Sequence, residues 1–393
     1  MPSTTQELGP ALDIDARLTE IERSVDLLLN TTPVNGAEAW ADFERSDFSA
    51  TPTLRLRPLE FDPDLVRRDL YNLEIENVAD PALHTLFRAK RDEIARQVTA
   101  LEDRDTTRFM HGSLQLYGGF AAHLVSTAEE LLDAIPAQAP DTRSVTAGAF
   151  AEAARAELVR YRARYPGFPV HVEVRDDVSE LMVSFGRLLI PEGATIRADR
   201  VEPLLHHEVG THVVTYQNGA RQPLRLLAIG LPGYDETQEG LAVLAEYLTG
   251  GLDPRRLRVL AARVVAVDKM LGGASFLEIF ESLRGDHQLP TRTAWSTAIR
   301  VVIGGGSVKD AIYLRGISRL LELLADGGGI DVLLVGKLAL DHIPLVQELL
   351  DRDVLEPAWV RPRWLDLPGA EERLDKLRAG ATVFDLYEPE ASA

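Results

Sequence analysis

The chain has 393 residues, of which 45% are hydrophobic and 26% charged, so it can fold into one large or two ordinary globular domains. Its net charge of -19 argues against binding to nucleic acid or to an anionic membrane, because neither contact has a source of positive charge. The absence of cysteine excludes disulfides and thiolate chemistry, and no apolar run approaches the roughly 18 to 20 residues that span a bilayer.

Residues 1–50 are predicted to form a polar, partly flexible leader with one amphipathic helix near Leu18–Leu29. The start of this leader, Met1–Glu7, lacks the basic region and apolar stretch of a secretory signal, so we expect a cytoplasmic location. A single helix-rich domain is then predicted over residues 51–370, followed by a C-terminal tail over residues 371–393.

The first part of this domain is predicted to be helical, over residues 58–103, 114–135 and 145–165. The apolar spacing then changes, because valines at 170, 172 and 174 alternate with polar residues, which is typical of a strand. Residues 181–185 and 187–191 are predicted to form two more strands. The predicted fold class is α+β and mostly helical, with a small, mainly antiparallel sheet ahead of the next helix.

That next helix, predicted over residues 201–217, carries His207, Glu208 and His212. In the familiar H-E-x-x-H zinc motif the histidines are four residues apart and lie about 40° apart around an α-helix. Here they are five residues apart, which on a regular helix would separate them by about 140°. A π-type turn near Gly210 would return both histidines to one face, and such turns occur mostly at functional sites.

A third ligand is predicted on the following helix, over residues 235–248. Glu236, Glu239 and Glu246 lie near one face of that helix, and only one of them is needed. Two imidazoles and one carboxylate form the ligand set of catalytic zinc sites, which keep one position open. Glu208, next to the first histidine, is then predicted to be the general base.

A histidine pair on an amphipathic helix is more often structural than metal-binding. Here the pair lies in an otherwise apolar helix, where polar side chains are rarely buried unless they are paired or bound to a metal. The glutamates that follow on the next helix complete the pattern, so the combination favours Zn²⁺. His206 is either a hydrogen-bonding neighbour of this site or a surface histidine.

Peptide hydrolysis by an exopeptidase requires two further kinds of residue in the site. The oxyanion formed during hydrolysis needs an electrophile, for which the candidates are Tyr234, Arg300, Tyr313 and Arg315. An exopeptidase also needs a cation for the terminal carboxylate of its substrate, for which the candidates are Arg300, Lys309 and Arg315. The favoured interpretation of these cations is nevertheless that they are ordinary solvated or ion-paired helix residues.

The segment Gln238–Ala242, together with the His207–His212 motif, resembles the QEGLA-motif family, also called flavohaemoglobin-expression-modulating proteins. It is also similar to the microtubule-associated tyrosine carboxypeptidases. Segments Lys309–Gly316 and Gly328–Lys337 add to a resemblance that covers roughly residues 50–365. The strands that lead into the histidine helix resemble the layout of thermolysin-like zincins, in which an edge strand holds an extended peptide.

The resemblance implies a zinc metallopeptidase with His207, His212 and Glu239 as ligands and Glu208 as base. It also implies a carboxypeptidase whose substrate is the C-terminus of a peptide or protein. The tyrosine carboxypeptidases act on acidic tubulin tails, whereas this chain has 61 acidic and 42 basic side chains, so like charges would oppose that encounter.

The alternative function is a zinc-binding regulatory protein that modulates a partner or expression without hydrolysis. Structural zinc sites are usually closed by four protein ligands rich in cysteine, whereas this chain offers three ligands, an adjacent base and no cysteine. The enzyme is therefore favoured. The sequence leaves open the physiological substrate, the choice between exo- and endopeptidase, and the oligomeric state.

Overall fold

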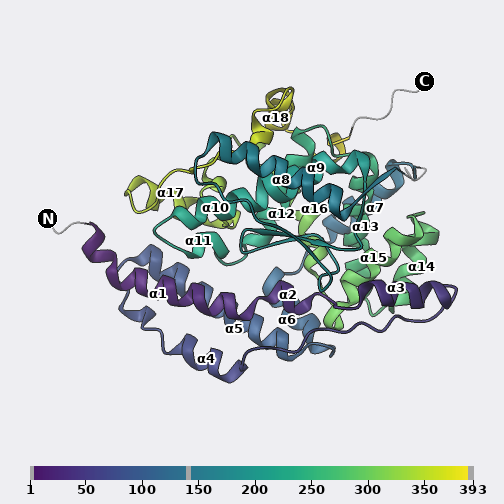
Figure 1. Cartoon of the computed structure of the whole chain (residues 1–393), viewed down its shortest axis with the longest axis horizontal. Helices are drawn as coiled ribbons and strands as arrows, with labels where there is room; N and C mark the ends of the chain where they lie inside the picture. The colour runs from purple at the N-terminus through teal and green to yellow at the C-terminus, as the bar shows by residue number, and fades with distance from the viewer. Residues whose placement is uncertain (1–3, 139–142, 388–393) are drawn as a thin grey trace.

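The computed structural model describes residues 4–138 and 143–387. Helices make up most of the molecule and two small sheets lie among them (Figure 1), which confirms the predicted α+β, mostly helical class. Residues 1–3 of the predicted leader and 388–393 of the predicted tail lie outside the described residues.

The main helices of the N-terminal half are α1 (Thr4–Val25), α2 (Leu27–Thr31), α3 (Gly36–Arg45), α4 (Pro63–Tyr71), α5 (Pro81–Glu102), α6 (Arg108–Tyr117), α7 (Ala122–Ala134) and α8 (Ala147–Arg164). The strands are β1 (Ser144–Thr146), β2 (Val172–Arg175), β3 (Met182–Ser184), β4 (Arg187–Pro191) and β5 (Thr195–Arg197). The helices that follow are α9 (Val201–His207), the π-helix η3 (Glu208–Val213), α10 (Val214–Arg221), α11 (Leu226–Ile229), α12 (Tyr234–Leu248), α13 (Pro254–Leu271), α14 (Phe276–Glu281), α15 (Thr291–Val302), α16 (Ile312–Ala325), α17 (Ile343–Asp351) and α18 (Ala370–Arg378).

The predicted helix over residues 114–135 is instead two helices, α6 and α7. Gly118 ends α6 with a φ of 73°, a conformation that glycine adopts without steric cost. The predicted helix over residues 235–248 begins one residue earlier, after Gly233, which adopts a φ of 68°.

The first 50 residues contain α1, α2 and α3, which lie in the lower half of the view in Figure 1, above α4. Leu18, Val25 and Phe43 in this segment are buried in the same hydrophobic core as α12 and α13. Leu374 in α18, within the predicted tail, belongs to that core as well. The division into leader, domain and tail stays a prediction, but the described parts of all three segments share one core.

The three predicted strands are present as β2, β3 and β4, in the order β2-β4-β3. β3 and β4 form an antiparallel hairpin, whereas β2 pairs with β4 in parallel, so the prediction of a mainly antiparallel sheet needs correction at β2. The central position of β4 is the reason, because a chain that passes from β2 to the far edge and returns through a hairpin runs parallel to β2. The antiparallel pair of β1 and β5 is not predicted from the sequence.

The turn between β3 and β4 packs closely against the continuous helical segment α9–η3–α10, which carries His207 and His212. Phe185 and Gly186 have φ values of 46° and 74°, as in the two-residue turns that match the twist of a hairpin. A Cβ atom on Gly186 would lie 2.4 Å from the Cδ1 atom of Tyr216 in α10, so glycine permits this close approach. Strands β3 and β4 also contact η3.

Helix α12 lies in the centre of the core and crosses α16 at very short range. Leu241, Leu244 and Leu248 of α12 are fully buried. A Cβ atom on Gly240 would lie 2.6 Å from the carbonyl carbon of Gly316, and one on Gly316 would lie 2.2 Å from the carbonyl oxygen of Glu236. The two glycines therefore set the position of α12 against its neighbour.

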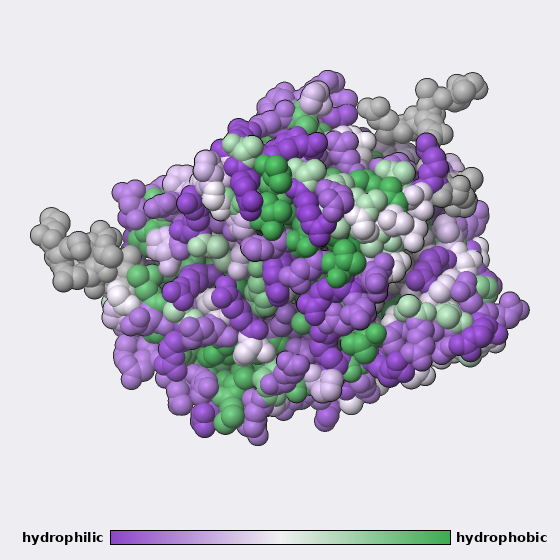
Figure 2. Space-filling model, viewed as in Figure 1, coloured by the Kyte–Doolittle hydropathy of each residue, from purple (hydrophilic) through white to green (hydrophobic). Residues whose placement is uncertain are grey.

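Hydrophilic residues cover most of the face in Figure 2, and hydrophobic residues show there in separate patches. Among the described helices, none is long and apolar enough to cross a membrane.

The crossing of α12 and α16 predicts that Gly316→Ala is strongly destabilising. The added methyl group would force two backbones apart, and overpacking of this kind costs about 1–3 kcal/mol or more. Urea unfolding of the purified variant measures the loss. The matched control is Gly148→Ala in α8, where the nearest atom is 4.0 Å from the added Cβ and a gain of about 0.5–1 kcal/mol is expected. Equal stability of the two variants would contradict this packing.

Candidate active site

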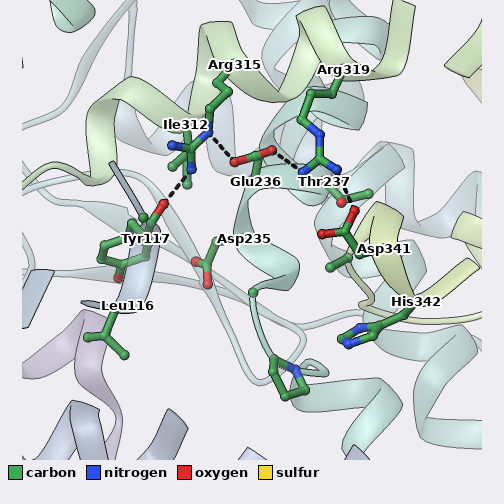
Figure 3. A pocket seen from close by; sticks show the side chains of 14 residues that line it. Leu116, Tyr117, Asp235, Glu236, Thr237, Ile312, Arg315, Arg319, Asp341 and His342 are labelled. Carbon is green, nitrogen blue, oxygen red and sulfur yellow. Dashed lines mark hydrogen bonds and ion pairs between the residues drawn. The ribbon is translucent and has the colours of Figure 1, made fainter. Parts of the chain in front are cut away.

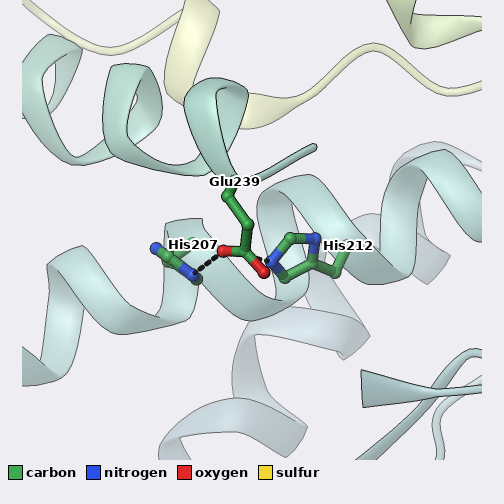
Figure 4. A group of neighbouring side chains, drawn as sticks. All are labelled: His207, His212 and Glu239. Carbon is green, nitrogen blue, oxygen red and sulfur yellow. Dashed lines mark ion pairs between the residues drawn. The ribbon is translucent and has the colours of Figure 1, made fainter. Parts of the chain in front are cut away.

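His207, which is buried, and His212 and Glu239, which are half-buried, converge on one point, although they come from α9, η3 and α12 (Figure 4). The Oε2 atom of Glu239 lies 3.5 Å from Nε2 of His207 and 3.7 Å from Nε2 of His212. One possible ligand atom from each residue lies within 4.8 Å of the other two. An ion bound tetrahedrally at about 2.1 Å would hold its ligand atoms about 3.4 Å apart, which is close to both His–Glu separations.

The convergence depends on the predicted π-type turn, which the structure confirms as the π-helix Glu208–Val213. This turn widens the helix by one residue, so that side chains five positions apart share one face. The two imidazole centres are 5.1 Å apart, with the ring planes inclined at 78°. Gly210 lies within the widened turn, as predicted.

Side chains satisfy the carbonyl groups that the widened turn displaces from regular helical bonding. The Thr211 hydroxyl donates to the carbonyl of His206 at 3.1 Å, and the indole N–H of Trp364 donates to the carbonyl of Gly210 at 3.0 Å. Trp364 is fully buried, and a Cβ atom on Gly210 would lie 2.8 Å from its Cδ1. Glycine at 210 is therefore required by packing as well as by the turn.

Glu208 lies beside the convergence point without belonging to the three-residue cluster. Its Oε1 atom is 4.0 Å from Nε2 of His207, and its side chain is 9% exposed. Burial raises the pKa of Glu208, which makes its carboxylate a better proton acceptor than a solvated one. This is the position expected of a general base next to the first histidine.

His207 is oriented by a buried ionic network that the sequence does not reveal. Its Nδ1 atom lies 2.8 Å from Oε1 of Glu246, so a ring N–H donates to that carboxylate and Nε2 is left facing Glu239. Glu246 also accepts hydrogen bonds from Arg200 at 2.6 Å and from Arg256 at 3.2 Å. Although burial raises the pKa of Glu246, these two arginines hold it well below its usual value.

The contact that orients the His212 ring is longer than the one that orients His207. Its Nδ1 atom lies 3.5 Å from Oε1 of Gln238, whose oxygen also accepts a hydrogen bond from the Thr215 hydroxyl at 2.7 Å. The amide oxygen can accept from the ring N–H, which leaves Nε2 directed towards Glu239. Both imidazoles are therefore oriented through Nδ1, as in metal-ligating histidines generally.

The donor set fits a divalent cation. Oε2 of Glu239 is buried and has no hydrogen-bond partner among the described residues, although a buried carboxylate oxygen is costly unless it is satisfied. Burial lowers the pKa of His207, but the neighbouring carboxylates of Glu239 and Glu246 raise it to about 9, so this group of carboxylates favours a positive charge between them. A metal ion bound by neutral imidazoles would supply that charge.

Of the remaining glutamates on α12, Glu236 faces away from the histidines. It pairs with Arg315 and Arg319 in a polar cavity of about 250 Å³, where Arg319 also binds Asp341 (Figure 3). Glu246 supports His207 rather than joining the cluster. The geometry thus separates the three glutamates that the helical pattern left as alternatives.

The cations predicted for substrate binding are engaged elsewhere. Arg300 donates to both oxygens of Asp310 at 2.7 Å and pairs with Glu180, and Lys309 pairs with Asp235 at 3.0 Å. Arg300 and Lys309 also line a groove of about 940 Å³. Arg315 pairs with Glu236, as described above. The interpretation of these residues as ion-paired helix positions therefore matches the geometry.

Two tyrosines and one histidine were also singled out by the sequence. Tyr313 is 9% exposed and lies under Arg263, whose guanidinium is 4.6 Å from the ring centre, while Glu239 is close enough to raise its pKa further after burial. Tyr234 begins α12 and is buried enough to raise its pKa well above the usual value. His206 is 2% exposed and lies near Glu202, so it is not a surface histidine.

The fold and the site define a mostly helical α+β protein with a His-His-Glu cluster that could hold a metal ion. The sequence model of the microtubule-associated tyrosine carboxypeptidase family matches residues 41–382, and the chain belongs to this family. This confirms the resemblance to these carboxypeptidases. Comparisons with curated proteins and with solved structures give no significant match.

The network around His207 predicts a double effect of Glu246→Gln. Arg200 and Arg256 lose the buried carboxylate that they share, which costs about 3–5 kcal/mol in a buried ion pair, and His207 loses the carboxylate that orients it. Loss of such an orienting partner weakens metal binding about 10- to 100-fold. Urea unfolding and competition with a chelator measure the two effects. Glu202→Gln, at a glutamate on α9 with a 78% exposed side chain, is the control and should change neither.

Proposed function

We propose that this protein is a zinc metallopeptidase that removes a C-terminal residue from a peptide or protein. The observation that carries the proposal is the convergence of His207, His212 and Glu239 at one point with Glu208 beside it. Membership of a family described as tyrosine carboxypeptidases supports the C-terminal mode of cleavage. The proposed location is cytoplasmic.

Each residue has a defined part in this proposal. His207 and His212 present Nε2 and Glu239 presents Oε2 as ligand atoms. When bound there, zinc supplies Lewis acidity towards water and towards the scissile carbonyl. Glu208 takes the proton from the attacking water and passes it to the leaving amine, because it lies beside the ligands without being one of them.

The proposal includes a zincin-like arrangement of substrate and helix. β3 is an edge strand of its sheet and contacts η3, which carries Glu208 and His212. An edge strand offers backbone groups to which an extended peptide can add as a further strand. A substrate bound along β3 would then cross in front of the histidines.

The net charge of the chain limits the kind of polypeptide that it can bind as a substrate. Because the protein carries a net charge of -19, strongly acidic polypeptides are disfavoured as partners. We therefore propose the carboxypeptidase chemistry for this chain without a microtubule partner.

The first test is metal content. We expect about one zinc per chain in protein purified without added metal, as measured by elemental analysis. His207→Ala, His212→Ala and Glu239→Ala should each lower this content, because a site with two protein ligands binds zinc far more weakly. Wild-type zinc content in all three variants would refute the ligand assignment.

The second test separates catalysis from metal binding. Glu208→Gln keeps the shape of the side chain and removes the proton acceptor, so zinc content and thermal stability should stay close to wild type. Hydrolysis of a peptide with a free C-terminal aromatic residue should fall by about 10²- to 10⁴-fold, as read by mass spectrometry of the products. Equal turnover would remove Glu208 from the mechanism, and an inactive wild type with zinc in place would favour the non-catalytic regulator.

A further inference from the structure

A buried lysine without a partner lies next to the candidate site. Lys337 is 7% exposed, and among the described residues its ammonium group has neither a hydrogen-bond acceptor nor a carboxylate at ion-pair distance. The centre of the Tyr234 ring lies 5.4 Å from Nζ. Such a lysine is exceptional, because buried ammonium groups are almost always paired.

The backbone fixes Lys337 against the segment that leads into α12. Its N–H donates to the carbonyl of Leu227 at 2.7 Å, and its carbonyl accepts from the N–H of Leu231 at 2.9 Å. Asp235, and after it Glu239 and Glu208, lie close enough to favour the charged form of Nζ, although among the described residues none of the three is at ion-pair distance. Lys337 therefore lies near the start of α12 and near the candidate site, but outside the ligand cluster.

Burial of the Lys337 ammonium group, which has no paired carboxylate among the described residues, is energetically costly, whereas the nearby buried cation Lys309 is paired. Burial lowers the pKa of Lys337 to about 8. Burial also acts on Lys309, but Asp235 at 3.0 Å raises the pKa of Lys309 well above its usual value. A buried cation that has no paired carboxylate is a candidate for binding a ligand of opposite charge.

The other cations near the site are already compensated. Arg300, Lys309 and Arg315 each pair with a carboxylate, and Arg256 binds Glu246. Arg263 has nitrogen atoms without hydrogen-bond partners among the described residues, but it faces Asp310 at 3.5 Å. The charged groups that act most on Arg263 do not include Glu239 or Glu208, in contrast to Lys337.

We propose that Lys337 binds the C-terminal carboxylate of the substrate, an inference that rests on the proposed function. The terminal carboxylate lies one residue, about 3.5 Å of extended backbone, beyond the scissile carbonyl. A cation that selects chain ends must therefore lie near the catalytic base and the ligands without pairing with either. A substrate with a neutral C-terminus would leave this buried ammonium unpaired, so Lys337 would determine specificity for an end over an interior bond.

The test measures binding rather than turnover. Zinc-loaded Glu208→Gln protein is titrated with an N-acetylated dipeptide that has a free C-terminal carboxylate, and with the same dipeptide as its C-terminal amide, by calorimetry. We expect the acid to bind roughly 10- to 100-fold more tightly than the amide, since hydrogen bonds to charged groups have this strength. In the Glu208→Gln, Lys337→Met double variant this preference should disappear while the affinity for the amide stays unchanged.

Two controls make the result specific. Lys376→Met in the Glu208→Gln background removes one charge from α18, where the side chain is 54% exposed, and should keep the preference for the acid. Lys337→Met should keep or raise the melting temperature, because methionine retains most of the apolar stem and removes an unpaired buried charge. A purely structural lysine would instead lower the melting temperature when replaced.

The outcomes distinguish this proposal from the proposed function. A preference for the acid that persists in the Lys337→Met double variant, or equal losses for acid and amide, would overturn the role of Lys337 and leave the zinc peptidase intact. A preference that depends on Lys337 in a protein whose wild type hydrolyses no peptide would retain the carboxylate site and refute the catalysis.

Discussion

The candidate site depends on one extra residue in the helix between His207 and His212. A regular helix would place their rings about 140° apart, and no displacement of α12 could then bring Glu239 to both. The widened turn solves this problem but displaces carbonyl groups, one of which accepts the indole N–H of Trp364. Because Trp364 lies 154 positions away from Gly210, this local distortion is stabilised only in the complete fold.

The two carboxylates around the histidines, Glu246 and Glu239, have different ionic partners. Glu246 is compensated on its outer side by Arg200 and Arg256, so it can orient His207 without competing for the same position as Glu239. Within the described part of the chain, Glu239 has ion-pair partners only in the two histidines, and its Oε2 atom has no hydrogen-bond donor there. The two arginines thus offset the cost of burying the carboxylate of Glu246 behind His207, while the carboxylate of Glu239 stays available for a cation.

Local geometry decides how much of this could be predicted from the sequence. The spacing of His207 and His212 required a π-type turn, and alternating valines indicated β2, because both depend only on residues close in sequence. The parallel pairing of β2 with β4, the burial of Phe43 and the role of Glu246 depend on contacts between distant segments, which leave no periodic signal. Charge alone also could not decide which cations bind substrate, since a sequence does not show which cations already have partners.

Helix α12 joins these constraints within the segment Gln238–Ala242. Gln238 supports His212 and Glu239 faces both imidazoles, while Gly240 admits the backbone of α16 and Leu241 fills the core. Four consecutive residues therefore point to four different environments around one helical turn. A shift of α12 that made room for a side chain at 240 would also move the carboxylate of the preceding residue away from the histidines. The close crossing of two helices is thus a condition for the geometry of the site as well as for the stability of the core.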